Sequence, residues 1–274
     1  MRVVLASDYG FCFGVKSAID RLVEELEDGE VHTDGDIVHN NGVMKRLIEM
    51  GLKIEDSGGK TFAIRAHGLP PSRIKEVSKR YEKVVDLTCP IVKSLFEKAK
   101  GCRKEGYGVV VFGREGHAEM EALKGHVPDA IVTLEANFYG MERMCVLSQT
   151  TSSWIEFSEF IGDLVRLNST AKEIKIVNTV CPVTVNREDE VRRFSKMCDA
   201  IIVIGGRHSA NTGKLYRMAS RQTKAYWIES PDEVEGLDLQ GMDCVAIVSG
   251  TSTPAEDVEE VYEKISRRGG DEWA

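Results

Sequence analysis

The stretch "VVDLTCPIVKS" (84–94) places a cysteine where a strand-like run ends and a helical pattern begins. Its first residues are apolar and β-branched, as in a buried strand. Pro90 suits the first position of a helix, because the N–H that it lacks is not needed there. The stretch "IVNTVCPVTVN" (176–186) repeats this order around Cys181. A cysteine between a strand and a helix is therefore a recurring feature of the chain.

Short apolar runs alternate with amphipathic stretches along the whole sequence. The amphipathic stretches include "VKSAIDRLVEELE" (15–27) and "NREDEVRRFSKM" (186–197). This alternation predicts βαβ units with mostly parallel sheet. The expected strands are "MRVVLAS" (1–7), "VVDLT" (84–88), "GVVVFG" (108–113), "CVLSQ" (145–149), "IKIVN" (174–178), "AIIVIGG" (200–206) and "CVAIVSG" (244–250).

Polar residues recur at matched distances after three of the cysteines. The separations are 27 residues from Cys12 to His39, 28 from Cys89 to His117 and 28 from Cys181 to Ser209. A further strand end follows in each section, with His67, Thr150 and Ser252 respectively. This is a weak internal repeat of roughly 80 to 90 residues.

The repeat predicts an α/β fold of three related small lobes in a pseudo-threefold arrangement. We expect the first lobe over residues 1–88, the second over 89–180, and the third, with a C-terminal tail, over 181–274. Because ligands of parallel α/β sheets bind beyond the carboxyl ends of the strands, the expected site is a common centre faced by the three sets of strand ends.

Composition excludes several classes of function. The chain has 274 residues, a net charge of -8 and a pI near 5.4, which disfavours non-specific binding to nucleic acid. The first residues, "MRVVLASDYGFCFGV", lack the apolar core of a signal peptide. No apolar run approaches the ~18 residues of a membrane span. We therefore expect a cytoplasmic protein whose prominent cysteines are thiols, ligands or nucleophiles and not disulfides.

Cys12, Cys89 and Cys181 are the candidate metal ligands. Each precedes a helix, whose exposed N–H groups and positive dipole end favour the thiolate form that binds iron or zinc. Any one of them alone could be a buried core thiol, but their matched positions argue against this reading. The other four cysteines lie inside helix or strand runs and are expected to be core or surface residues: Cys102, Cys145, Cys198 and Cys244.

The spacing of the three cysteines favours an iron–sulfur cluster over structural zinc. They are 77 and 92 residues apart, without the short C-x₂₋₄-C pair that zinc sites usually show. An iron–sulfur cluster tolerates wide spacing and normally takes four cysteines, so three would leave one iron open for catalysis. No G-x-G-x-x-G follows the first strand, so electrons would come from outside the chain.

The polar residues at the strand ends suit a diphosphate ligand, because most of them are neutral hydrogen-bond donors and imidazoles add charge. They are His39, His67, His117, Thr150, Thr151, Ser209, Asn211 and Ser252. Glu119, two residues after His117, could be a helix N-terminal charge or, in a closed polar cavity, a proton donor.

Nine short motifs occur in order from residue 12 to about residue 257 and together resemble the 4-hydroxy-3-methylbut-2-enyl diphosphate reductase (LytB/IspH) family, an oxidoreductase family that catalyses the last step of the non-mevalonate isoprenoid pathway. The motifs are "FCFGV", "IVHNN", "AHG", "DLTCP", "GHAE", "SQTT", "VCPVTVNR", "HSANT" and "GTSTP". Each is weak alone, and their order and distances make the resemblance specific.

The resemblance implies a [4Fe-4S] cluster held by Cys12, Cys89 and Cys181, with an open iron that binds the substrate hydroxyl. It implies Glu119 as the centre of proton delivery and Thr150 beside the hydroxyl. The expected products are isopentenyl and dimethylallyl diphosphate, and the expected electron donor is a ferredoxin or flavodoxin. The implied substrate-binding residues are His39, His67, His117, Thr151, Ser209, Ala210, Asn211 and Ser252.

One residue departs from the family pattern. The family often reads Ser-Ser-Asn where this chain has Ser209-Ala210-Asn211, so one diphosphate contact is expected to be missing or supplied by a backbone N–H. Three alternatives remain at this point: an iron–sulfur hydro-lyase acting on a small phosphorylated substrate without reductant, a cluster-based redox sensor, and a structural zinc protein.

Overall fold

The computed structural model describes residues 1–270 and contains three parallel β-sheets of four strands each. The expected α/β class with several small parallel sheets is thereby confirmed. The chain forms two compact units: one comprises residues 1–16, 38–47 and 182 onward, and the other comprises 17–37 and 48–181. Two helices, α1 (Phe13–Glu27) and α2 (Asn41–Glu49), have residues in both units.

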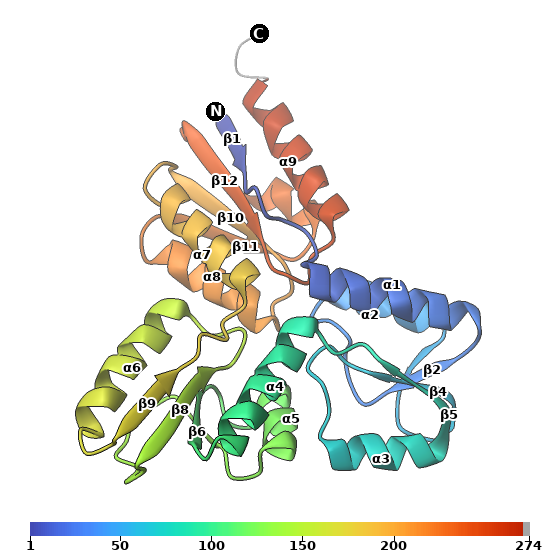
Figure 1. Cartoon of the computed structure of the whole chain (residues 1–274). Helices are drawn as coiled ribbons and strands as arrows, with labels where there is room; N and C mark the ends of the chain where they lie inside the picture. The colour runs from blue at the N-terminus through green and yellow to red at the C-terminus, as the bar shows by residue number, and fades with distance from the viewer. Residues whose placement is uncertain (271–274) are drawn as a thin grey trace. The chain divides into compact units, whose positions relative to one another are not determined.

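The first unit is built on one sheet with helices on both faces (Figure 1). Its strand order is β1 (Arg2–Leu5), β12 (Cys244–Ser249), β10 (Ala200–Ile204) and β11 (Lys224–Ile228). Its helices are α7 (Pro182–Phe194), α8 (Ala210–Ser220), η1 (Pro231–Gly236) and α9 (Ala255–Gly270). Along β10, Ile201 and Val203 pack against α7 and α8, whereas Ile202 and Ile204 pack against α9 and η1. Burial of both faces explains why this strand reads as a continuous apolar run.

The second unit contains the other two sheets. One has the order β3 (Leu52–Ile54), β2 (Val31–Thr33), β4 (Gly59–Ile64), β5 (Tyr81–Asp86), and the other β7 (Ile131–Thr133), β6 (Gly108–Phe112), β8 (Arg143–Ser148), β9 (Glu173–Ile176). Their helices are α3 (Pro71–Arg80), α4 (Pro90–Lys104), α5 (Ala118–His126) and α6 (Trp154–Leu167). Helices α4 and α5 share one core with β6 and β8, and α6 packs Phe157 against Phe112 of β6.

All three sheets have the same strand order. In the second unit each sheet places its strands in the order second, first, third, fourth along the chain. The sheet of the first unit follows the same rule if β1 is counted as its fourth strand. Cys12, Cys89 and Cys181 therefore each follow the fourth strand of a sheet. The three-lobe division at 88/89 and 180/181 stays a prediction, and the pairing of β1 with β12 adds the N-terminal strand to the sheet of the third lobe.

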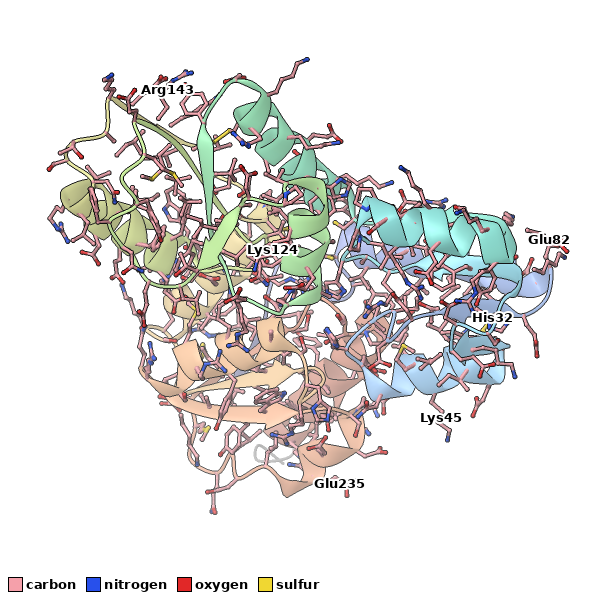
Figure 2. All side chains as sticks on the ribbon, turned by 90° about the horizontal axis from the view of Figure 1, so that it is seen from below. His32, Lys45, Glu82, Lys124, Arg143 and Glu235 are labelled. Atoms are coloured by element: carbon pink, nitrogen blue, oxygen red, sulfur yellow. A yellow bond between two sulfur atoms is a disulfide. The ribbon has the colours of Figure 1, made fainter. Side chains whose placement is uncertain are left out.

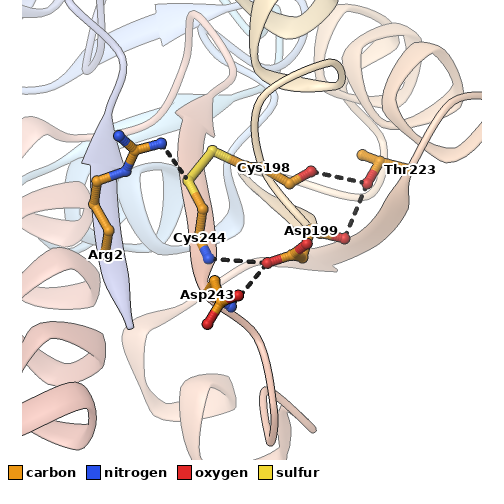
Figure 3. Close-up of a disulfide and its surroundings, with 6 residues drawn as sticks. All are labelled: Arg2, Cys198, Asp199, Thr223, Asp243 and Cys244. Atoms are coloured by element: carbon orange, nitrogen blue, oxygen red, sulfur yellow. Dashed lines mark hydrogen bonds between the residues drawn. A yellow bond between two sulfur atoms is a disulfide. The ribbon is translucent and has the colours of Figure 1, made fainter.

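Two disulfides differ from the expectation that the cysteines are unbridged. Cys102 is bonded to Cys145, and Cys198 is bonded to Cys244, as Figure 3 shows for the second pair. Cys102 lies in the last turn of α4 and Cys198 follows the end of α7, and each is packed against a strand of its sheet, so that the Cα atoms are 6.1 and 4.6 Å apart. The sequence could not show this, because the partners are 43 and 46 residues apart. Within residues 1–270, no helix is long and apolar enough to cross a membrane.

Candidate active site

The three predicted cluster cysteines lie outside the disulfides, are partly exposed, and stand at helix starts. Cys89 is the N-cap of α4, and Pro90 is the first helical residue. The carbonyl of Cys89 accepts from the N–H of Lys93 at 2.9 Å. Cys12 directly precedes α1, and its Sγ accepts from the N–H of Val15 at 3.4 Å. Cys181 directly precedes α7. The local prediction of a cysteine between strand and helix is therefore correct at all three positions.

In the first unit, six predicted site residues follow the carboxyl ends of strands or contact the loops there. The N–H of Cys12 donates to the carbonyl of Thr251 at 3.1 Å, which joins the loop after β1 to the loop of Ser252. A Cβ on Gly206 would lie 2.3 Å from the carbonyl oxygen of His39, so only glycine permits this approach of the His39 loop to the loop after β10. The latter loop leads into Ser209, Ala210 and Asn211.

The start of α8 presents donors that suit an anion. Ser209 is its N-cap and accepts from the N–H of Thr212 at 3.3 Å. Ala210 and Asn211 are the first two helical residues, whose N–H groups have no partner inside a helix. Asn211 is only 6% exposed, yet neither polar atom of its side-chain amide has a hydrogen-bond partner within the described residues. A buried amide of this kind calls for a polar ligand.

In the second unit, the ends of the two sheets bring two predicted histidines together. The rings of His67 and His117 meet edge to face with centroids 5.4 Å apart. The N–H of Cys89 donates to the carbonyl of Ala66, so the loop of His67 is bound to the start of α4 at 3.0 Å. His117 is the N-cap of α5, and its Nδ1 accepts from the N–H of Glu119 at 3.2 Å. This bond puts the proton of a neutral His117 ring on Nε2.

The loop before His117 is also supported from outside. Lys124 of α5, labelled in Figure 2, pairs with Glu115 at 2.7 Å. Both side chains reach solvent, so this ion pair contributes little to stability.

Glu119 is the most distinctive side chain of the second unit, because it is a carboxyl group that is 1% exposed and whose hydrogen-bond donors among the described residues are all neutral. Its two oxygens contact the N–H and the hydroxyl of Thr150, each at 2.7 Å. Burial raises the pKa of Glu119 to about 7, although the two bonds from Thr150 act in the opposite direction. A group with this pKa exchanges a proton near neutral pH, as a general acid must.

Thr150 connects this carboxyl group to a predicted cluster ligand, because its carbonyl accepts from the N–H of Cys181 at 2.8 Å. Gln149, which sequence reasoning missed, connects two further loops. Its Oε1 accepts from the N–H of Arg114 at 3.0 Å, and its Nε2 donates to Thr151 Oγ1 at 3.1 Å. The loops of Glu119 and Thr151 are thus held together by one buried amide. The sequence signal that could have identified Gln149 is its place inside the motif "SQTT".

The predicted site residues therefore form two groups, one in each unit. Cys12, His39, Ser209, Ala210, Asn211 and Ser252 belong to the first unit, and His67, Cys89, His117, Glu119, Thr150, Thr151 and Cys181 belong to the second. No cluster of three or more His, Cys, Asp or Glu side chains in the described part of the chain is arranged to hold a metal ion. Convergence of the three thiols on one cluster stays a prediction.

Similarity to known proteins decides the family. The model of the family described as LytB protein matches residues 3–266. The chain belongs to this family. A LytB relative from Thermotoga sp. (strain RQ2), named 4-hydroxy-3-methylbut-2-enyl diphosphate reductase, is 48% identical over 273 residues, which cover 98% of each chain.

One solved structure supports the same assignment, and a second shares the fold. A structure of (E)-4-hydroxy-3-methyl-but-2-enyl diphosphate reductase, the terminal enzyme of the non-mevalonate pathway, is 32% identical, with a TM-score of 0.73 and coverage of 97% of this chain and 100% of that one. A Plasmodium falciparum reductase shares the fold, with a TM-score of 0.85, 24% identity and coverage of 96% and 87%.

The resemblance seen in the motifs is confirmed by these similarities, and so is the class of the enzyme, an oxidoreductase. Enzymes of the LytB family use an iron–sulfur cluster. The names of the relatives favour a reductase over the hydro-lyase, sensor and zinc-protein alternatives.

Proposed function

We propose that the chain reduces 4-hydroxy-3-methylbut-2-enyl diphosphate to isopentenyl and dimethylallyl diphosphate. Two electrons and two protons are consumed, the C–O bond of the allylic alcohol breaks, and water leaves. The observation that carries the proposal is the pair formed by Glu119 and Thr150, a buried carboxyl group with a pKa of about 7 next to a hydroxyl at 2.7 Å. Loss of a hydroxyl group as water needs such a proton donor.

The proton transfer follows from the geometry of this pair. When Glu119 is protonated on Oε2, Thr150 Oγ1 can accept that hydrogen and direct its own O–H toward the substrate. The proton then moves from Oε2 through Thr150 to the departing oxygen, and the ionised carboxylate is stabilised by the two donors of Thr150. Glu119 is afterwards reprotonated from solvent. The second of the two protons consumed is added to a carbon atom of the allyl group.

The diphosphate end of the substrate is proposed to bind neutral hydrogen-bond donors of the chain. The side-chain amide of Asn211, the N–H of Ala210 at the start of α8, and the Nε2–H of His117 supply neutral donors. His39, His67, Thr151, Ser209 and Ser252 complete the proposed set. Binding the remote diphosphate holds the alcohol near Glu119, which is catalysis by orientation.

The residues of the chain fit an iron–sulfur cluster. The three cysteines that lie outside the disulfides are partly exposed, stand at helix starts, and follow equivalent strands of three sheets. We propose that Cys12, Cys89 and Cys181 hold a [4Fe-4S] cluster, with a ferredoxin or flavodoxin as electron donor and the cytoplasm as the location. When bound, the cluster supplies electrons and a Lewis-acidic iron for the C–O bond.

Anaerobic turnover tests the proposal. Protein reconstituted with iron and sulfide is given the substrate and a reduced low-potential dye, and the C5 diphosphate products are measured. We expect reductant-dependent products that are lost in Cys89→Ser. Turnover without reductant would favour the hydro-lyase, and an intact cluster without turnover would contradict the reductase assignment for this chain.

A further inference from the structure

Arg187 is a buried cation in the first unit to which the mechanism above assigns no role. Its side chain is 1% exposed and projects from α7, six residues after Cys181. Its Nη1 donates to the carbonyl of Ser249 at 2.9 Å, and its Nη2 donates to the carbonyl of Gly10 at 2.9 Å. Nη2 also pairs with the Asp8 carboxylate at 2.9 Å. One guanidinium group thus binds two loops that come from opposite ends of the sequence.

These two loops carry predicted site residues. Gly10 lies two residues before Cys12, and Ser249 lies three residues before Ser252. The loops also bind each other, because the N–H of Gly10 donates to Ser249 Oγ at 3.0 Å and the N–H of Cys12 donates to the carbonyl of Thr251 at 3.1 Å. Arg187 adds a donor to one backbone carbonyl in each loop, those of Gly10 and Ser249.

Glu190, one turn further along α7, binds the first residues of the same loop. Its Oε1 accepts from the N–H and the hydroxyl of Ser7 at 2.8 and 2.9 Å, and its Oε2 accepts from the N–H of Asp8 at 3.4 Å. Helix α7 therefore offers an acceptor to residues 7–8 and donors to residues 8–10. The segment that leads to Cys12 is fixed along its length by side chains of the helix that begins after Cys181.

We propose that Arg187 is a positioning residue for the reduction. It sets the position of Cys12 as a cluster ligand relative to Ser252 as a diphosphate contact. This inference rests on the proposed function. Residues that orient metal ligands from behind commonly change affinity or activity by ~10- to 100-fold when they are replaced.

The choice of arginine supports a positional role. Removing a guanidinium group from water is unfavourable, and an apolar side chain of the same size commonly gives equal or better stability. Only arginine presents several donors in a rigid planar fork, and here the fork reaches two backbone carbonyls and a carboxylate at once. Lysine has one nitrogen at the end of a flexible chain and cannot span the same three acceptors.

The test compares Arg187→Lys with a variant that lowers stability on the same helix without touching the two loops. Val191→Ala is that control, because Val191 is fully buried in the core between α7 and the sheet. In the cluster-free protein, the alkylation rates of Cys12, Cys89 and Cys181 are measured separately by peptide mass spectrometry. We expect Arg187→Lys to raise the rate of Cys12 by about tenfold and to leave Cys89 unchanged, because local loosening exposes only the affected loop.

Two further measurements use the reconstituted enzyme. We expect altered g-values of the reduced cluster in Arg187→Lys, and a KM that rises by roughly tenfold together with a lower kcat. Val191→Ala should keep the g-values and the KM of the wild type. Equal changes in the two variants, or an unchanged Cys12 rate in a folded Arg187→Lys protein, would overturn the inference.

If Arg187→Lys does not fold, Ser249→Ala replaces it, because this change removes only the hydroxyl that accepts from Gly10 and lies 3.4 Å from Arg187 Nη1. We expect the Cys12 alkylation rate to rise by about threefold in this variant, and no rise would contradict the inference. Alkylation is measured without cluster or substrate. Its result can therefore be interpreted even if the chain proves not to be a reductase.

Discussion

Two fully buried glutamates, Glu119 in the second unit and Glu188 in the first, have opposite electrostatic surroundings. Glu119 is 1% exposed, and within residues 1–270 its carboxyl group is hydrogen-bonded to the N–H and hydroxyl of Thr150 alone. Glu188 is 0% exposed and forms ion pairs with Lys214 at 2.5 Å and Arg192 at 3.3 Å. Glu119 is the second residue of α5, and Glu188 lies in the middle of α7.

The difference shows what separates a structural buried charge from a chemically active one. Glu188 joins α7 to α8, and two cations compensate its charge, so its burial stabilises an arrangement of helices. In the part of the chain that the structure describes, Glu119 has no cation among its hydrogen-bond partners, and it takes up a proton at a pH where an exposed glutamate would be ionised. Burial alone therefore does not distinguish a chemically active carboxyl group from a structural one. The distinguishing feature is the lack of a cationic partner.

The same substitution at the two positions should change stability in opposite directions. Glu188→Gln leaves Lys214 and Arg192 without their shared carboxylate, and we expect it to lower the free energy of unfolding by about 3 kcal/mol. Urea denaturation at neutral pH measures this effect. The double variant Glu188→Gln with Lys214→Met should recover part of the loss, and a fully additive loss would show that the pair is not coupled.

Glu119→Gln is expected to affect turnover most. The variant keeps the size of the side chain, and its Oε1 can still accept from the N–H of Thr150 while its amide nitrogen donates to Thr150 Oγ1. It cannot release a proton, so kcat should fall by ~100-fold or more. Substrate affinity should stay within roughly tenfold, because the diphosphate contacts remain. Steady-state kinetics and equilibrium binding, both done anaerobically, separate the two effects. Wild-type turnover in this variant would remove Glu119 from the mechanism.

Glu119 also predicts a dependence of stability on pH. Because its pKa of about 7 in the folded protein exceeds the ordinary 4.5, the folded state holds the proton more tightly than the unfolded chain. The resulting stability is fully present below pH 4.5 and is lost as the pH rises through 7. Glutamine does not ionise, so at pH 8 we expect Glu119→Gln to be more stable than the wild type by about 3 kcal/mol.

Urea denaturation of both proteins at pH 5 and pH 8 tests this expectation. The difference between wild type and Glu119→Gln should be small at pH 5 and large at pH 8. A difference that does not depend on pH would show that Glu119 is ionised throughout this range.

The hydroxyl of Thr150 should have the smallest of the four effects. Thr150→Val keeps the shape and the backbone N–H but removes the Oγ1 bond, which lowers the pKa of Glu119. We therefore expect the pKa of Glu119 to rise further, the descending limb of the kcat–pH profile to move to higher pH, and kcat to fall by about tenfold. Thr150→Ser, which retains a hydroxyl, should keep the wild-type profile. A shift to lower pH in Thr150→Val would contradict the assigned direction.

Most of the parallel α/β architecture could be predicted, because long buried strands such as β10 and β12 have continuous apolar sequences. Each of the seven expected strand runs overlaps a strand of the structure, although β5, β8 and β9 begin before the expected runs. The expected helix over 186–197 begins earlier, at Pro182, and ends at Phe194. Short strands such as β2 and β3 were not expected, since three residues show no periodicity.

The candidate site could also be predicted only in part. The sequence by itself determined the residue types and their order: three cysteines between strand and helix, and polar side chains after successive strands, because strand, turn and capping signals are local. Only the tertiary structure decided that β1 completes the sheet of β12, that Arg187 binds the Gly10 and Ser249 loops, and that Glu119 lacks a cation where Glu188 has two. These features depend on contacts between residues far apart in the chain, and the protonation of a carboxyl group depends on which side chains packing places around it.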